Sequence, residues 1–438
     1  MSAVKPLVQA LDERIAAQLE ACTRCGACVE ACPMPPLVNL PTPSPEALIT
    51  GVAEWLNTGD GPAPARRWAD ICTGSGDCID ACPEGVNPRF LLTMARRAIA
   101  KGREPTERRA LGKSQFKKMS RSVRLLSRLQ LPPHLLERLS PSSHPELNSS
   151  PDVIFYTGCN LLKTPHIGLL CLDILDRLDL RYEVHGGPAM CCGILQMRGG
   201  DDENSLRQGT RTLTQLAAAA PGHILSWCPT CQLQFTETTI PVQGASTSLE
   251  MTMFPVYLAS QLERLKPHLT VPVNKTVALH EHPGTPGVVD AVRTLLKEVP
   301  GIDLVDLPVP KIGYSLTALT AVPETQTALL TRELDAAKAA GVDVLVSVYH
   351  TEHRELAVQA PHLPFEIANY MELIGAAMGL HREDTYQRLQ AMRDVDAMLE
   401  ASLPTLTANA VRLDDARATV AEMLNDHVLP IPQPSRRP

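Results

Sequence analysis

The N-terminal region is organised around the run Cys22-Thr-Arg-Cys25-Gly-Ala-Cys28-Val-Glu-Ala-Cys32-Pro33. Its C-x2-C-x2-C-x3-C-P spacing lets three thiolates hold three iron corners of one cubane cluster. The fourth cysteine, which a proline follows, is directed to the other cluster of a two-cluster protein. Zinc is the competing interpretation of clustered cysteines, but this spacing favours iron and sulfide.

A second run follows, Cys72-Thr-Gly-Ser75-Gly-Asp77-Cys78-Ile-Asp-Ala-Cys82-Pro83. It has a serine where a run of the first type would have its second cysteine. If the two clusters exchange ligands, the thiolates divide into a set of four and a set of three. The first set is Cys22, Cys25, Cys28 and Cys82, and the second is Cys32, Cys72 and Cys78. Three thiolates can hold a [3Fe–4S] cluster without another ligand.

This second run resembles the iron–sulfur subunit of succinate dehydrogenase and fumarate reductase. That family has the same C-x5-C-x3-C-P spacing, followed by a glycine and an Asn-Pro pair, which are Gly85 and Asn87-Pro88 in this chain. The resemblance covers residues 18–95 and implies an all-helical ferredoxin fold with a [4Fe–4S] and a [3Fe–4S] cluster. A second [4Fe–4S] cluster, completed by Ser75 or Asp77 or left open to solvent at one iron, is the alternative.

A third group of cysteines lies in a region where strands and helices alternate, which predicts a mainly parallel sheet. Apolar strands are expected at Val153–Thr157 and His223–Trp227, with a helix over Leu161–Leu178 between them. Two of the cysteine groups directly follow these strands, and the carboxyl ends of parallel strands meet at one sheet edge. Five thiolates there exceed what one zinc ion needs. They are Cys159, Cys191, Cys192, Cys228 and Cys231.

This third pattern resembles the CCG domain of heterodisulfide reductase, glycolate oxidase iron–sulfur subunits and the C subunit of anaerobic glycerol-3-phosphate dehydrogenase. The resemblance covers residues 150–265 and implies a third iron–sulfur cluster, which in heterodisulfide reductase is a noncubane [4Fe–4S] cluster. An ordinary cubane or a zinc site is the alternative. Cys171 stands outside all these spacings and is expected to be a core residue of an apolar helix.

A second, degenerate copy of this repeat is expected to reach residue 380. Shifting the five cysteines by 122 positions places them on Glu281, Gly313, Tyr314, His350 and His353. The copy therefore has no cysteine at a ligand position, which puts paired-cluster disulfide chemistry in doubt. His350 and His353, with His280 and His282, either bind zinc or iron or are relics of a lost site that hydrogen-bond locally.

The 438 residues and the formal charge of −7 are those of an ordinary globular protein and argue against nucleic-acid binding. The first residues lack the basic start and apolar core of a signal peptide, and no apolar run approaches the ~18 residues of a membrane span. A cytoplasmic location is expected, with peripheral attachment at the inner face of a membrane as an option. Residues 96–128 carry twelve Lys and Arg against Glu104 and Glu107, which indicates a solvated segment or a docking surface.

The expected architecture is a helical two-cluster ferredoxin domain followed by an α/β region of two CCG-type repeats with mainly parallel sheets. The boundaries are 1–100 for the ferredoxin domain, 101–150 for a basic linker, 151–265 for the complete repeat, 270–380 for the degenerate repeat and 381–438 for a helical tail.

A ferredoxin domain followed by CCG repeats in one chain predicts an electron-transfer subunit of a multisubunit oxidoreductase. By the resemblance, electrons pass between a flavoprotein dehydrogenase or an electron-transfer flavoprotein and an acceptor, with a quinone or a membrane complex among the candidate acceptors. The chain has no GxGxxG followed by an acidic residue, so any flavin is expected on a partner. The alternatives are a catalytic disulfide reductase acting at the CCG cluster and an assembly module that holds zinc.

Overall fold

The computed structural model describes residues 5–41, 44–143, 150–243, 249–313 and 317–432. Within residues 5–41 and 44–101 all regular structure is helical, as expected for the ferredoxin region. Asn87 caps the last of these helices by accepting from the amide of Phe90 at 2.9 Å. The helices are α1 (Lys5–Ala21), α2 (Ala27–Glu30), α3 (Met34–Leu37), α4 (Pro45–Thr58), α5 (Ala63–Asp70), α6 (Asp77–Asp80) and α7 (Pro88–Lys101).

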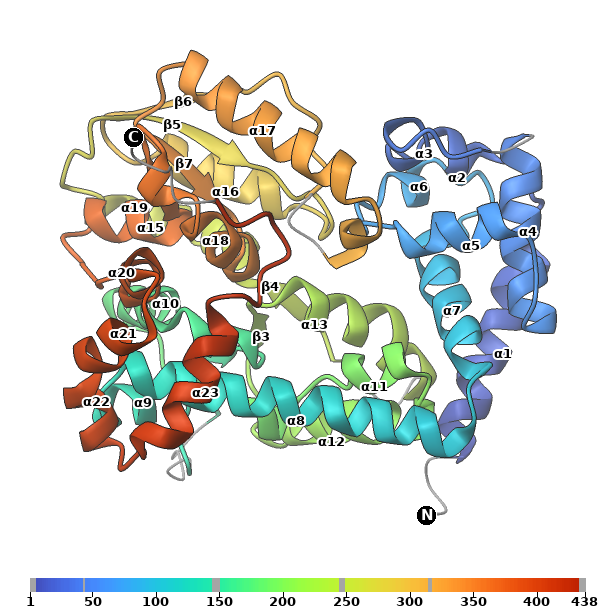
Figure 1. The fold of residues 1–438 in the computed structure, drawn as a ribbon, viewed down its shortest axis with the longest axis horizontal. Helices are drawn as coiled ribbons and strands as arrows, with labels where there is room; N and C mark the ends of the chain where they lie inside the picture. The colour runs from blue at the N-terminus through green and yellow to red at the C-terminus, as the bar shows by residue number, and fades with distance from the viewer. Residues whose placement is uncertain (1–4, 42–43, 144–149, 244–248, 314–316, 433–438) are drawn as a thin grey trace.

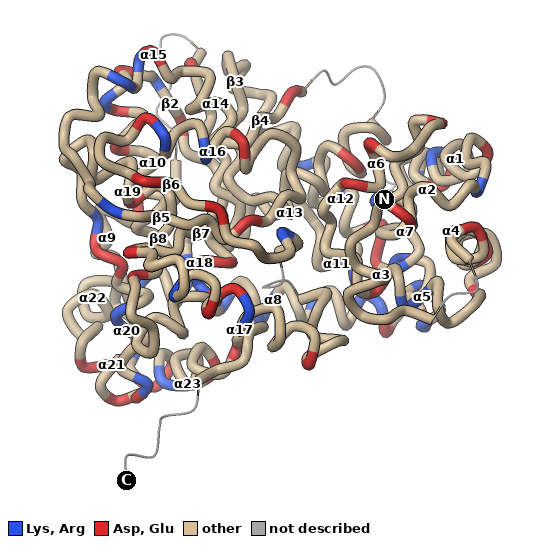
Figure 2. The backbone as a smooth tube through the Cα atoms, turned by 90° about the horizontal axis from the view of Figure 1, so that it is seen from above, with Lys and Arg blue, Asp and Glu red and all other residues tan. Residues whose placement is uncertain are grey.

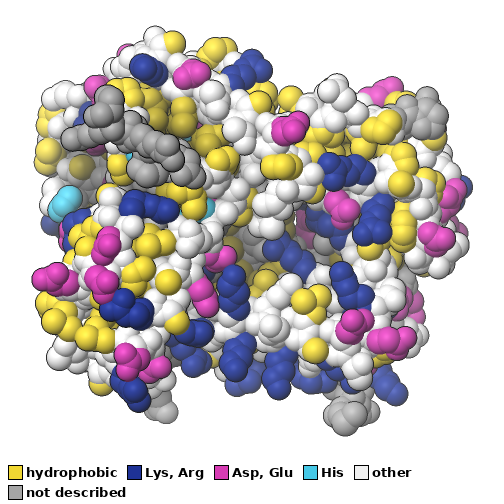
Figure 3. Space-filling model, in the orientation of Figure 1, with side chains coloured by type: hydrophobic (Ala, Val, Ile, Leu, Met, Phe, Trp, Pro, Cys, Tyr) yellow, Lys and Arg dark blue, Asp and Glu magenta, His cyan; other side chains and the backbone are white. Residues whose placement is uncertain are grey.

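The segment expected to be a basic linker is a helix, α8 (Pro105–Gln130), followed by α9 (Pro133–Leu139). The helix forms because one face carries apolar residues at helical spacing, and Met119, Val123 and Leu126 are buried. Its basic residues lie on the opposite face, and Figure 3 shows Lys and Arg gathered along the edge where α8 runs in Figure 1. The remainder of the expected linker includes residues 144–149, which lie outside the described part of the chain.

The first repeat contains a four-stranded sheet in the order β2-β1-β3-β4, with every pair parallel. Its strands are β1 (Val153–Tyr156), β2 (Tyr182–His185), β3 (His223–Ser226) and β4 (Met251–Met253). Its helices are α10 (Pro165–Arg177), α11 (Ile194–Gly199), α12 (Asp202–Ala218), α13 (Pro229–Gln234), α14 (Phe254–Ser260) and α15 (Leu262–Leu265). Short turns of helix fill the connections, namely η1 (Asn160–Lys163), η2 (Pro188–Met190), η3 (Phe235–Thr239), η4 (Pro241–Gln243) and η5 (Lys266–His268).

The second repeat has the same topology, because its sheet runs β6-β5-β7-β8 and is also parallel throughout. Its strands are β5 (Lys275–His280), β6 (Ile302–Val305), β7 (Val344–Ser347) and β8 (Glu366–Asn369). Its helices are α16 (Val288–Lys297), α17 (Pro323–Ala339), α18 (His350–Ala357) and α19 (Tyr370–Ala377), with η6 (Thr317–Ala321) and η7 (Ala360–His362). The expected fold class, helical ferredoxin followed by parallel α/β repeats, is confirmed.

The two repeats share one apolar core. Helix α10 packs on α19 and α14 packs on α16, so the core continues from one sheet to the other. The indole of Trp227 in the first repeat stacks on the ring of Tyr370 in the second, with centroids 5.9 Å apart and planes 7° apart. Figure 2 shows α1 to α7 on one side of the molecule and the two repeats on the other.

The tail consists of α20 (Thr385–Met392), α21 (Val395–Ala401), α22 (Leu403–Ala408) and α23 (Leu413–Met423). It folds back on α8, with which it forms a separate apolar cluster that includes Leu126, Leu129 and Leu406. Among the described residues, no helix is both long enough and apolar enough to cross a bilayer.

Candidate iron–sulfur centres

The first set of expected ligands converges on one pocket. Its lining includes Cys22, Cys25, Cys28 and Cys82, so the last cysteine of the second run joins three from the first. Burial raises the pKa of Cys28 to about 12, and the neighbouring sulfurs of Cys22, Cys82 and Cys25 contribute to that rise. Gly26 precedes α2 in a left-handed conformation (φ 83°), and an added Cβ would lie 2.7 Å from Pro45. Four thiols around one pocket suit a cubane cluster.

The second set is also brought together across the two runs. Burial raises the pKa of Cys32 to about 11, and Cys72 lies close enough to contribute to that rise. Cys78 is buried, and its pKa is raised first by burial and then by Cys72 and Cys32. The indole N–H of Trp68 lies 3.4 Å from the Cys32 sulfur and donates to it. Asp77 also acts electrostatically on Cys32, so a carboxylate stands near this set of three thiols.

The five cysteines of the first repeat are all buried at the carboxyl edge of the first sheet. Cys159 follows β1, and Cys228 is the N-cap of α13 directly after β3. The sulfurs of Cys159, Cys191, Cys192, Cys231 and Cys228 form a chain of side-chain contacts in that order. The hydrogen bonds from Cys159 and then Cys192 hold the pKa of Cys191 well below its usual value. Five adjacent thiols fit an iron–sulfur cluster and exceed the four ligands of a structural zinc site.

Two glycines explain why the cysteines can approach so closely. Gly193 follows the Cys191-Cys192 pair with φ 87°, and a Cβ there would lie 2.3 Å from the carbonyl oxygen of Ser205. Its amide donates to the Cys191 sulfur at 3.5 Å. Gly158 has φ 65°, and its missing Cβ leaves room for Cys228 and Cys231. Cys171 lies in the apolar core instead and is fully buried within α10.

Arginines occupy the space between the second and third thiol groups. Arg96 donates to the carbonyl oxygens of Ala69 and Cys72 at 3.0 and 3.4 Å. Arg198 lies within electrostatic reach of Arg96 on one side and of Cys192 and Cys228 on the other. Two positively charged side chains, Arg96 and Arg198, therefore lie between the second thiol set and the third.

Arg89 joins all three regions of the molecule, and the sequence patterns did not identify it. Its guanidinium donates to the carbonyl of Gly74 at 2.9 Å, pairs with Glu237 of the first repeat and donates to Gly284 of the second. An added Cβ at Gly76, which has φ 94°, would lie 3.1 Å from this guanidinium. The one feature of the sequence that could have drawn attention to Arg89 is its position directly after the Asn87-Pro88 start of α7.

Comparison with known proteins identifies two domains at these sites. Residues 18–86 match the model of the 4Fe-4S dicluster domain, and residues 153–236 match that of the CCG cysteine-rich domain. The chain joins a 4Fe-4S dicluster domain to a CCG domain. The matched ranges enclose all seven cysteines of the first two sets and all five of the third.

Longer matches extend over most of the chain. The D subunit of dihydromethanophenazine:CoB--CoM heterodisulfide reductase from Methanosarcina barkeri is 22% identical over 396 residues, which cover 83% of this chain and 95% of that protein. The protein of the same name from Methanosarcina mazei is 22% identical over 398 residues, with the same coverage. The chain is an iron–sulfur protein similar to the D subunit of heterodisulfide reductase, as the resemblance implied.

In the second repeat of this ferredoxin–CCG chain, the four histidines expected to bind metal contact different partners. His280 is buried against Glu333 at 2.9 Å, and His282 against Glu352 at 2.8 Å. His353 lies 2.6 Å from Asp384 instead. His350 lies beside Thr351 at 3.4 Å. These contacts are those expected of histidines that hydrogen-bond locally, and metal binding by this set stays a prediction.

The shift of 122 residues also misplaces two positions. Cys228 is the N-cap of α13, and Tyr349 is the N-cap of the corresponding helix α18. When the two N-caps are aligned, Tyr349 corresponds to Cys228, and Glu352 corresponds to Cys231. Glu281 forms an ion pair with Lys311 at 2.8 Å, so its carboxylate is neutralised locally. Gly313 packs against His282, where a Cβ would lie 2.5 Å from the ring, and Tyr314 lies outside the described residues.

Proposed function

We propose that this chain is an electron-transfer subunit of a multisubunit oxidoreductase and relays electrons between a flavoprotein partner and an acceptor. The observation that carries the proposal is the series of three thiol groups in one body, with Arg96 and Arg198 between the second and the third. Iron–sulfur clusters supply reversible one-electron transfer when bound at such sites. The residues of the chain hold, space and shield them.

The chain can favour the reduced, more negative state through donors and positive charge near the sulfurs. Trp68 donates to Cys32, and the amide of Gly193 donates to Cys191. Arg89 acts electrostatically on Cys78 from its bridging position. These groups would tune the second and third centres separately, because each contacts a different set of sulfurs.

The ligand sets belong to the proposal. Cys22, Cys25, Cys28 and Cys82 would hold a [4Fe–4S] cluster, and Cys32, Cys72 and Cys78 a [3Fe–4S] cluster. The five cysteines of the first repeat would hold a third cluster, of noncubane type by the similarity to heterodisulfide reductase. A flavin would sit on a partner whose acidic surface meets the exposed lysines and arginines of α8, such as Lys113, Lys117 and Arg121.

The test is electron paramagnetic resonance on anaerobically purified full-length protein, titrated stepwise with reductant while iron is quantified on the same sample. The proposal expects a three-iron signal in the oxidised state and a further signal that disappears in Cys192→Ala. Retention of zinc in place of iron at the third site, with two centres remaining, would contradict the relay.

A catalytic disulfide reductase is the second candidate, and one observation favours it. Glu352 lies within electrostatic reach of Cys228 and contacts His282 at 2.8 Å, so an imidazole–carboxylate pair borders the third thiol group. Multiple turnovers of a heterodisulfide with reduced viologen, abolished by Cys192→Ala, would support catalysis. Reduction of one equivalent or none would leave the relay as the function.

A further inference from the structure

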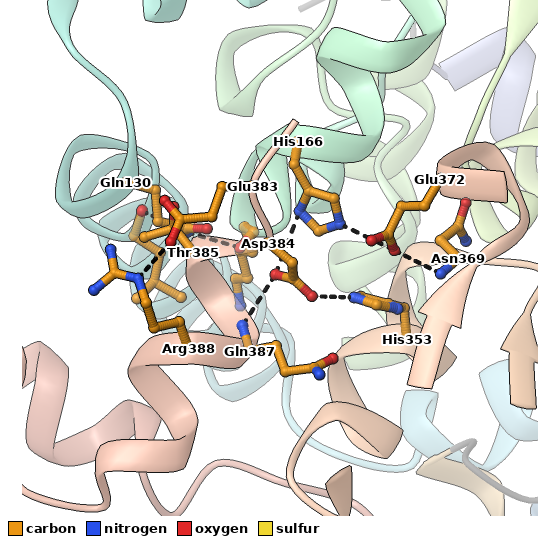
Figure 4. A network of polar contacts seen from close by, with 12 residues as sticks. Gln130, His166, His353, Asn369, Glu372, Glu383, Asp384, Thr385, Gln387 and Arg388 are labelled. Carbon is orange, nitrogen blue, oxygen red and sulfur yellow. Dashed lines mark hydrogen bonds and ion pairs between the residues drawn. The ribbon is translucent and has the colours of Figure 1, made fainter. Parts of the chain in front are cut away.

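A buried cluster of two histidines and two carboxylates lies where the first repeat, the second repeat and the tail meet. His166 comes from α10, His353 from α18 and Glu372 from α19, and Asp384 is the N-cap of α20. Figure 4 shows the four side chains pointing toward one another from these separate elements. None of them belongs to the thiol groups described above.

The separations within this His–carboxylate cluster suit ligands of one metal ion. Nδ1 of His166 lies 3.4 Å from Oδ1 of Asp384, and Nε2 of the same ring lies 3.6 Å from Oε1 of Glu372. An imidazole binds an ion through one nitrogen, so one of these two separations would join atoms bound to the same ion. Nitrogen and oxygen ligands of tetrahedral zinc, bound at ~2.0–2.1 Å, lie about 3.3 Å from each other. One ligand atom from each of the four residues lies within 4.8 Å of the other three.

Both nitrogens of the buried His166 imidazole face carboxylates of the cluster, but neither forms a hydrogen bond of good geometry. Its side chain is 3% exposed, and neither ring nitrogen forms a hydrogen bond within the described part of the chain. The same holds for Nδ1 of His353, whose ring centroid lies 5.3 Å from that of His166. Buried polar atoms without partners are rare and require an explanation. A shared ion would bind one nitrogen of each ring.

The charge balance points in the same direction. Two carboxylates lie in this largely buried cluster, and among the described residues neither forms an ion pair with a lysine or an arginine. The nearest arginines in sequence are engaged elsewhere, Arg382 with Asp173 at 2.7 Å and Arg388 with Glu383 at 2.7 Å. A divalent cation would neutralise both carboxylates.

The carboxylates are held in place by backbone donors, as outer-shell contacts of metal ligands usually are. Glu372 accepts from the amide of Asn369 at 2.7 Å as part of a capping box, and Asp384 accepts from the amide of Gln387 at 3.0 Å. The Asn369 contact leaves the second oxygen of Glu372 available, whereas the second oxygen of Asp384 lies 2.6 Å from Nε2 of His353 and orients that ring. The cluster is therefore organised by elements that do not depend on an ion.

We propose that His166, His353, Glu372 and Asp384 bind one divalent transition-metal ion, with zinc as the best fit, which cross-links the two repeats and the tail. Two imidazoles and two carboxylates in a buried four-ligand arrangement match the nitrogen and oxygen donors of zinc sites. Magnesium and calcium are disfavoured because they take few nitrogen ligands. The ion has a structural role here, since its ligands come from four separate helices.

The experiment uses the full-length, cluster-loaded protein, purified without a histidine tag, incubated with one equivalent of zinc and desalted. We expect about one zinc per chain, and a zinc K-edge absorption spectrum with nitrogen and oxygen neighbours at ~2.0–2.1 Å and no sulfur at ~2.3 Å. The absence of sulfur separates this site from zinc held by any of the cysteines. Failure to retain zinc, or a sulfur shell, would overturn the proposal.

Variants give the residue assignment. His166→Ala and Asp384→Asn should lower retained zinc at least five-fold without changing iron content. His381→Ala is the matched control, because His381 is exposed and lies three residues from Asp384. If His166→Ala does not fold, Asp384→Asn keeps the side-chain shape and decides the assignment. Full zinc retention in Asp384→Asn, or equal loss in His381→Ala, would refute it.

Discussion

The two repeats share one topology but differ in what they place at the carboxyl edge of their sheets. Both sheets have four parallel strands in the same order. The first repeat gathers five buried cysteines there. The second has neutralising pairs instead, with His280 on Glu333, His282 on Glu352 and Lys311 on Glu281. The second repeat therefore has the same fold without cysteine ligands, and its buried charges are paired with one another.

This difference separates two kinds of stabilisation. Adjacent buried thiols require an ion or a cluster to bring them together as thiolates, because burial and mutual proximity raise the pKa of Cys159, Cys192 and Cys231. In the second repeat, by contrast, His280 and His282 each contact a carboxylate directly, at 2.9 and 2.8 Å. Substitutions among the thiols of the first repeat should thus alter cofactor content, and those in the His280–Glu333 and His282–Glu352 pairs should alter stability.

The largest expected effect is on the third centre. Cys192→Ala should remove it entirely and leave both N-terminal centres, because Cys192 is the middle member of the sulfur chain in the first repeat. Iron analysis and paramagnetic resonance measure this loss. Cys171→Ala is the control, since Cys171 is equally buried but lies in the apolar core. Unchanged iron in Cys192→Ala would contradict the ligand assignment.

A smaller change is expected at the second centre. Ser75→Cys supplies the thiol that the second run lacks, and should convert a three-iron cluster to a four-iron one. The three-iron signal of the oxidised protein should disappear, with a gain of about one iron per chain. Persistence of that signal would show that Ser75 is not positioned to complete the cluster.

In the second repeat the expected effect is on stability alone. His282→Ala leaves Glu352 buried without its partner and should lower the free energy of unfolding by about 3 kcal/mol. Glu352→Leu in addition should recover more than half of that loss, measured by anaerobic urea denaturation. Iron content should not change. Loss of iron in either variant would instead assign this pair to the cluster site.

The smallest expected effect is a pH dependence that arises in the first repeat. Burial, and then the charge of Arg354, lower the pKa of Lys163 to about 7, against 10.5 for an ordinary lysine. The unfolded chain therefore holds more protons than the folded one from about pH 7 to 10.5. Stability should rise with pH in that window, by at most about 1.4 kcal/mol per unit.

Lys163→Met removes this titration, so the difference in urea midpoint between the wild type and the variant should shrink as pH rises from 7 to 9. A difference that stays constant with pH would mean that Lys163 keeps an ordinary pKa. Lys113→Met on the exposed face of α8 is the control and should show no such trend.

Local pattern determined much of this protein. Cysteine spacing indicated the ferredoxin and CCG domains, because cluster ligation depends on short, regular separations along the chain. Alternating strands and helices indicated parallel sheets, and the expected strands at Val153–Thr157 and His223–Trp227 correspond to β1 and β3. The helix expected over Leu161–Leu178 begins at Pro165, since a proline favours the first helical turn and η1 precedes it.

Long-range contacts decided the rest. The basic segment became α8 because the tail and the first repeat cover its apolar face, and the tail lies far away in sequence. His166 and His353 are separated by 187 residues, and Arg89 meets Gly284 across a similar distance, so no local pattern could pair them. Sequence indicated which cysteines are candidate cluster ligands, because the spacing of cysteines is local information. Tertiary structure alone decided which partners the buried charges and histidines contact, because these contacts depend on the packing of elements that are distant in sequence.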